Sequence, residues 1–129
     1  MLAIDTNLIV RYLADDDPRQ SAQARRLIDR EDVFVSTTVL LETEWVLRSV
    51  YGYAGSPLAA VLRAFAGLPS VTIEDAGLIR QALDWMDAGL DFADALHLAK
   101  AAGCDAFVSF DRRFARVANR LGAGKVRLP

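Results

Sequence analysis

The sequence predicts an α/β fold of three layers, in which a parallel sheet of about five strands lies between helices. Short apolar runs alternate with helix-like segments along all 129 residues, and this alternation is typical of parallel-sheet domains. The apolar runs are continuous and do not alternate in polarity, as expected for strands that are covered on both faces. Because the chain has neither an internal repeat nor a long linker, we expect a single domain over residues 1–129.

The predicted elements begin and end at local signals. Asp17 and Pro18 provide a helix cap and a first helical residue, and Asp75 and Asp91 are caps of two later helices. The predicted strands cover residues 2–5, 33–36, 70–73 and 105–110, with 125–128 as a short fifth. The predicted helices cover about residues 7–14, 18–30, 38–51, 56–66, 76–86, 91–103 and 111–121.

Composition narrows the class of protein. Hydrophobic residues make up 53% of the chain and charged residues 25%, which excludes a disordered chain and hints at apolar surface covered by a second copy or a partner. Cys104 is the single cysteine and His97 the single histidine, so neither a disulfide nor an ordinary zinc site is expected. No signal peptide or membrane-spanning run is recognisable, and we expect a cytoplasmic protein.

Charge is distributed unevenly along the chain. The residues before position 112 include 9 basic and 17 acidic side chains, whereas the last segment carries six basic side chains and no acid. Arg112, Arg113 and Arg116 begin this segment and are candidates for contact with a polyanion such as RNA, since the guanidinium group binds phosphate in a bidentate manner. A solvated helix face is the alternative interpretation.

Two acids follow predicted strands. Asp5 ends the first strand and Asp111 comes just after the fourth. The carboxyl ends of parallel strands lie at one edge of a sheet, where sites of α/β proteins form, so both side chains are expected there. Each acid is also well placed to be only a helix cap.

Two further acids lie among apolar residues. Asp94 lies three residues after the cap Asp91 within an apolar helix, where the helix dipole alone also favours an acid. Glu42 has no basic neighbour at helical spacing, whereas Glu44 has Arg48 four residues later, as an ordinary surface pair does. An unpaired Glu in apolar surroundings is costly unless a proton or a cation neutralises it.

These acids come from four separate segments and predict a metal site if they converge. A cluster of Asp5, Glu42, Asp94 and Asp111 would repel itself, and a divalent cation would reverse that penalty. Oxygen ligands select hard ions, so Mg²⁺ or Mn²⁺ is favoured. Such ions lower the pKa of a bound water and stabilise attack at phosphorus, which makes phosphodiester hydrolysis the expected chemistry.

The same stretches resemble a PIN domain, specifically a VapC-type ribonuclease toxin of a toxin–antitoxin system. The matching segments are "IDTNLIVRYL", "VSTTVLLETEWVLRSVYG", "DFADALHLAKAAGCD" and "FVSFDRRFAR", and they follow one another in the family's order. The resemblance implies a PIN-like α/β/α fold with a five-stranded parallel sheet. It also implies Mg²⁺- or Mn²⁺-dependent endoribonuclease activity, a homodimer and a small antitoxin that blocks the active-site groove.

Residue roles also follow from the resemblance. Asp5 would be the central metal ligand, and the other three acids, Glu42, Asp94 and Asp111, would complete an acidic catalytic pocket with it. A second set of residues would support these ligands by hydrogen bonding: Thr6, Asn7 and Ser109, with Asp91 as a helix cap and possible auxiliary acid.

Several other interpretations remain. A phosphatase similar to haloacid dehalogenases is disfavoured because Asn7 stands where that family has a second Asp. A PIN nuclease of RNA processing without an antitoxin and a non-catalytic PIN module that binds RNA or protein are the alternatives to a toxin.

A few residues outside the acid cluster invite structural interpretations. We expect Tyr51 and Tyr53 to pack at an edge or a dimer contact, with base stacking as the alternative. Cys104 is expected to be buried, and Trp45 and Trp85 to lie in the core or at an interface.

Overall fold

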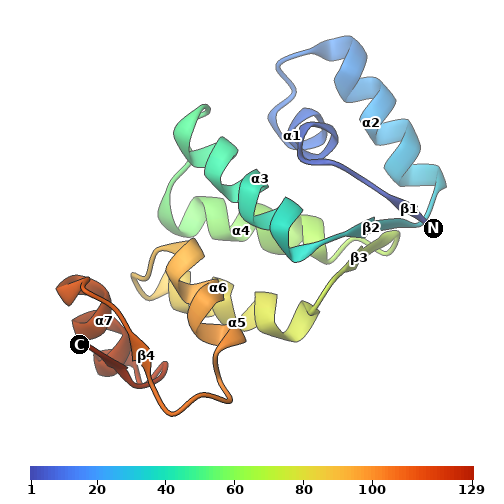
Figure 1. Cartoon of the computed structure of the whole chain (residues 1–129). Coiled ribbons are helices and arrows are strands. Elements are labelled where there is room, and N and C mark those ends of the chain that lie inside the picture. The colour runs from blue at the N-terminus through green and yellow to red at the C-terminus, as the bar shows by residue number, and fades with distance from the viewer. The chain divides into compact units, whose positions relative to one another are not determined.

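The protein divides into two compact units, Met1–Ala76 and Gly77–Pro129, in a computed structural model that describes residues 1–129. Figure 1 shows the helices and strands of both units. None of the helices is long and apolar enough to cross a membrane.

The first unit contains a parallel sheet of three strands. The strands β1 (Leu2–Ala3), β2 (Val33–Val35) and β3 (Val71–Ile73) lie in the order β1-β2-β3. Leu2 is in register with Val33, and Val33 is in register with Val71. The central strand β2 buries Val33 and Val35 completely, as expected for an apolar strand with a neighbour on each side.

Four helices accompany this sheet: α1 (Thr6–Ala14), α2 (Pro18–Arg30), α3 (Thr37–Ser49) and α4 (Gly55–Ala66). Helix α1 packs against both α2 and α3 (Figure 1). The core consists of aliphatic and aromatic side chains, each of which stabilises the unit by about 1.5–3 kcal/mol on burial. Its fully buried members include Ile9, Ile28, Leu40, Leu47, Leu58, Leu62 and Phe65.

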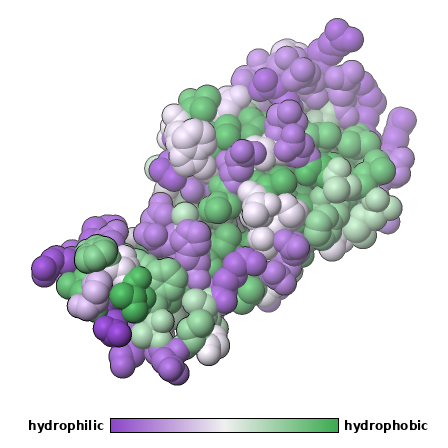
Figure 2. Space-filling view, in the orientation of Figure 1, coloured by the Kyte–Doolittle hydropathy of each residue, from purple (hydrophilic) through white to green (hydrophobic).

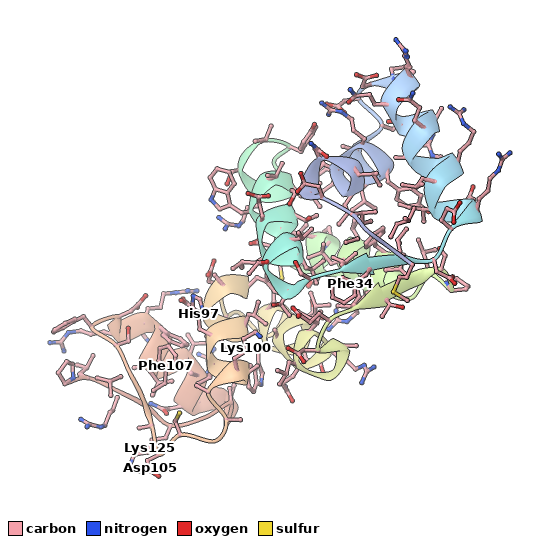
Figure 3. All side chains as sticks on the ribbon, turned by 45° about the vertical axis from the view of Figure 1, so that its right-hand side comes forward. Phe34, His97, Lys100, Asp105, Phe107 and Lys125 are labelled. Carbon is pink, nitrogen blue, oxygen red and sulfur yellow. The ribbon has the colours of Figure 1, made fainter.

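The second unit contains α5 (Ala76–Asp87, whose first residue closes the first unit), α6 (Phe92–Lys100), β4 (Phe107–Val108), α7 (Arg112–Leu121) and β5 (Val126–Arg127). Strands β4 and β5 are parallel, and the Phe107 amide donates to the Lys125 carbonyl at 2.8 Å. Both residues are labelled in Figure 3. The side chain of Asn119 hydrogen-bonds to both backbone groups of Val126 and thereby joins α7 to β5.

The predicted α/β fold class is confirmed, since seven helices and five strands are present and every strand pair is parallel. The hydrogen bonds divide the strands between a three-stranded and a two-stranded sheet, one in each unit. The strands are shorter than predicted: β1 ends at Ala3 and β4 at Val108, and Asp5 and Asp111 beyond them cap α1 and α7.

The prediction that Cys104 is buried is wrong, and the prediction for Trp45 is narrowed to one of its two alternatives. Cys104 is exposed because it lies in the turn that follows α6, outside the helix. Trp45 is 55% exposed and lies outside the core, since the buried face of α3 passes through Leu40, Thr43, Glu44 and Leu47, and its place at an interface stays a prediction.

Candidate functional site

In the first unit, Asp5 and Glu42 lie in one hollow although they are far apart in the sequence. Asp5 follows β1 and caps α1, with one carboxylate oxygen accepting the Thr6 amide at 2.8 Å. The Thr6 hydroxyl donates to a carboxylate oxygen of Glu42 on α3. Both acids, together with Thr6 and Asn7, line a hollow of about 280 Å³. The structure thus brings together two of the four predicted acids and shows that Thr6 orients Glu42.

The relative burial of the two acids of α3 is the reverse of the prediction. Glu44, expected at the surface, is 1% exposed and pairs with Arg48 at 3.1 Å, whereas Glu42 is exposed. The pairing between Glu44 and Arg48 was predicted correctly, but the helix faces the core with Glu44 and not with Glu42. Glu42 is consequently free to face a ligand in water, and apolar burial no longer explains why it is unpaired.

Arg11 and Tyr51 form the far wall of the same hollow. The Arg11 guanidinium donates to Asp16 at 3.0 Å, to Gln20 at 2.6 Å and to the Tyr51 hydroxyl at 3.2 Å. The Tyr51 hydroxyl donates to Asp16 at 2.6 Å. This hydrogen bond is the main cause that lowers the pKa of Asp16 and raises the pKa of Tyr51.

The sequence did not indicate that Arg11 belongs to this hollow or that it binds Asp16, Gln20 and Tyr51. Arg11 lies one helical turn after Asn7, and this spacing was the available signal that both face the same side of α1. Asp17 caps α2 as predicted, since its side chain accepts the Gln20 amide. Asp15 and Asp16, however, pair with Arg25 and Arg11.

In the second unit, three acids lie near one another. Asp91 caps α6 by accepting the Asp94 amide at 3.2 Å, and Asp111 caps α7 by accepting the Phe114 amide at 2.9 Å. Partial burial raises the pKa of Asp94, and the negative charges of Asp91 and Asp111 raise it further, while His97 acts in the opposite direction. His97 itself is exposed on α6 (Figure 3).

Ser109 supports this group of acids through the backbone. Its hydroxyl oxygen accepts the Asp111 amide at 3.0 Å, and a hydrogen bond from this hydroxyl to a ligand carboxylate stays a prediction. Asn7 is exposed and lines the hollow of the first unit. Its proposed role in orienting carboxylates stays a prediction.

Capping does not exclude metal binding at these positions. Asp5 and Asp111 each use Oδ1 to accept a backbone N–H. A carboxylate has two oxygens with several lone pairs, so Oδ2 of each side chain is left for a cation. The two interpretations that the sequence left open are therefore compatible with each other.

The convergence of all four acids stays a prediction. Asp5 and Glu42 belong to the first unit, and Asp94 and Asp111 belong to the second. No group of three or more His, Cys, Asp or Glu side chains is arranged to hold a metal ion in the structure. The predicted RNA-binding residues Arg112, Arg113 and Arg116 lie in the first half of α7, and all three are exposed.

A family model described as the PIN domain matches residues 2–120. The chain belongs to the PIN domain family. The match runs through both units, from β1 to the end of α7, and confirms the PIN resemblance that the sequence motifs indicated.

Among solved structures, this PIN domain is similar to the sarcin–ricin-loop-cleaving toxin VapC20 of Mycobacterium tuberculosis. The two chains are 25% identical, the alignment covers 90% of this chain and 94% of the toxin, and the TM-score is 0.46. No curated protein matches the chain.

Proposed function

We propose that this PIN domain is a metal-dependent endoribonuclease, the toxin component of a VapBC-type pair. The observation that carries the proposal is that none of Asp5, Glu42, Asp94 and Asp111 forms a salt bridge with Lys or Arg. The neighbouring acids Asp15, Asp16 and Glu44 do form such pairs. Within a PIN domain, carboxylates without a Lys or Arg partner fit the role of ligands for a hard cation.

The donors present fit Mg²⁺ or Mn²⁺. All four side chains offer only carboxylate oxygens, which hard divalent ions prefer over softer metals. Partial burial and, after it, the charges of Asp91 and Asp111 raise the pKa of Asp94, and a bound cation would favour its charged form again. When bound, such an ion lowers the pKa of a coordinated water and stabilises negative charge on the attacked phosphate.

The proposed side-chain roles are of two kinds, metal ligands and residues that hold those ligands in position. Asp5 and Asp94 hold the principal ion, and Glu42 and Asp111 complete the ligand set or position the attacking water. Thr6 fixes the rotamer of Glu42 through its hydroxyl, and Asp91 and Ser109 hold the ends of α6 and α7 that carry the ligands of the second unit. We propose that the two units together make up one PIN domain over residues 1–129.

The proposed partners follow from the same function. Arg112, Arg113 and Arg116 would contact phosphates of the RNA, because all three are accessible at the start of a segment without acids. A small antitoxin protein would cover the acids, and a second copy of the chain would form a homodimer. The cytoplasmic location stays a prediction.

Two other functions remain as alternatives. A PIN nuclease of RNA processing would show the same chemistry without an antitoxin, and a neighbouring gene for a small DNA-binding protein would distinguish the toxin from it. A non-catalytic PIN module would bind RNA without cleaving it. The four unpaired acids favour a nuclease over this last alternative.

The test is incubation of the purified protein with cellular RNA, with Mg²⁺ or Mn²⁺ and in parallel with a chelator. We expect cleavage that needs the metal and is lost in Asp5→Asn. Sequencing of the new RNA 5′ ends after brief expression in cells would then identify the substrate. Intact RNA under all metal conditions would contradict the proposed activity.

A further inference from the structure

We propose that the first unit carries a binding track for the phosphate backbone of RNA, formed by Arg11, Gln20, Gln23, Arg26 and Arg30 on α1 and α2. We call these residues the α1–α2 track. The inference rests on the proposed nuclease function. It places a substrate contact in the first unit, in addition to the one proposed for the arginines of α7.

The track is a series of three hollows that share walls. Asn7 and Arg11 line the hollow that contains Asp5 and Glu42, and they also line a second hollow of about 570 Å³ between α1 and α2. Gln23 and Leu27 line this second hollow and also a third. Neighbouring hollows thus share lining residues, and together they extend from the acids of the first unit along α2.

The side chains along the track are mainly hydrogen-bond donors. Helix α2 carries four arginines and one acid, Asp29. Arg25 is paired with Asp15, but neither Arg26 nor Arg30, which line the third hollow, forms a salt bridge or a side-chain hydrogen bond. Figure 2 shows hydrophilic residues gathered over α2, at the upper right of the view.

Arg11 joins the acids to the track. Its guanidinium is held by Gln20, Asp16 and Tyr51, so its position is fixed before any ligand binds. Because Arg11 is paired with Asp16 at 3.0 Å, it adds little net charge and instead holds in place the wall that the first two hollows share. Arg11 is thus a positioning residue for the RNA strand.

An RNA backbone fits these hollows better than an acidic protein segment does. Phosphates repeat along a strand and are matched by arginines and amides spaced along one helix. Protein segments instead anchor through buried apolar side chains, whereas the second hollow has four polar lining residues among its seven and the third has only Leu27 as an apolar one. Glu31 is the single acid on these two walls.

The matched pair of variants is Arg26→Glu and Arg25→Glu. The two residues are adjacent in sequence and undergo the same change of charge. Arg25 lies on the other side of the buried stripe of α2 that contains Ala24 and Ile28, and it lines none of the three hollows. The probe is a fluorescein-labelled single-stranded oligoribonucleotide of mixed sequence, measured by anisotropy in chelator so that binding is separated from cleavage.

We expect Arg26→Glu to weaken RNA binding about three- to tenfold and to reduce the salt dependence, by about 0.7 in slope for each phosphate that the protein no longer neutralises, while Arg25→Glu binds like the wild type. Equal binding of the two variants would overturn the track. A second probe is polyglutamate, which stands in for an acidic protein segment. If Arg26→Glu weakened the binding of polyglutamate but not of RNA, the track would also be rejected, because the face would then be a protein-docking face. If Arg26→Glu weakened RNA binding as expected but the wild type showed no metal-dependent cleavage, the track would be retained and the nuclease rejected.

Discussion

The acids of the two units are held in different ways. In the first unit, Glu42 accepts a hydrogen bond from the Thr6 hydroxyl, and Asp5 lines the same hollow as Glu42 and Arg11. In the second unit, Asp94 has acids as its main electrostatic neighbours, and its partial burial and their charges raise its pKa. The comparison indicates that a hydrogen bond orients a carboxylate in the first unit, whereas partial burial and neighbouring acids disfavour the charged form of one in the second.

The largest expected effect concerns the central acid of the first unit. Asp5→Asn keeps a side-chain oxygen that caps α1 but removes the charge, so the fold is retained and RNA cleavage falls by about 1000-fold. Initial rates of cleavage with Mn²⁺ measure this effect, and an unchanged melting temperature is the control. If cleavage continued at the wild-type rate, Asp5 would be only a cap.

A smaller effect is expected from the hydroxyl that orients Glu42. Thr6→Val has nearly the same shape but lacks the donor, and we expect activity or metal affinity to fall about 10–100-fold. Thr6→Ser keeps the hydroxyl and is the matched control, with near wild-type activity. Equal activity of the two variants would show that orientation of Glu42 has no part in the reaction.

The third prediction compares how much a buried and an exposed ion pair contribute to the free energy of unfolding. Arg48→Met leaves Glu44 buried without its ion pair, and the free energy of unfolding should fall by about 1–3 kcal/mol. Arg25→Met removes an exposed pair with Asp15 and should cost less than about 1 kcal/mol. Urea unfolding of both variants measures the difference, and equal losses would contradict the burial of Glu44.

The smallest effect is a pH-dependent change in the second unit. Because the pKa of Asp94 is raised in the folded protein, its stabilising contribution is present below the unfolded pKa and disappears as the pH rises through the folded value. Without metal at neutral pH, Asp94→Asn should therefore melt about 1–3 °C higher than the wild type, after allowance for solvent screening.

The difference between Asp94→Asn and the wild type should disappear near pH 3, where Asp94 is mostly protonated in both states, since an Asp side chain titrates at about 3.9 in unfolded chains. Added Mn²⁺ should stabilise the wild type more than the variant. A variant that melts lower than the wild type at neutral pH without metal would show that the acids of the second unit do not repel one another.

Much of the fold could be predicted from the sequence because its signals are local. Continuous apolar runs identified every strand, and caps such as Asp17 and Asp91 marked where helices begin. The strand ends were less predictable, since Asp5 and Asp111 begin a helix almost at once and shorten the ladder.

The candidate site was only partly predictable. The types and spacing of the acids indicated which carboxylates matter, and Asp5 and Glu42 do meet in one hollow. Which of Glu42 and Glu44 is buried could not be read from helical spacing, because α3 has apolar residues on most sides and its orientation is set by packing against α1 and α4. The contact between Arg11 and Tyr51 joins residues 40 positions apart and depends on the same packing.

The most direct test of the central claim is the affinity for Mn²⁺ measured by electron paramagnetic resonance on the wild type, Asp5→Asn and Asp94→Asn. If acids of both units serve one function in metal binding, both variants should bind Mn²⁺ about 10–100-fold more weakly, and the double variant should be little weaker than either. Wild-type affinity in Asp94→Asn, or effects that simply add in the double variant, would contradict the claim that the four acids act together.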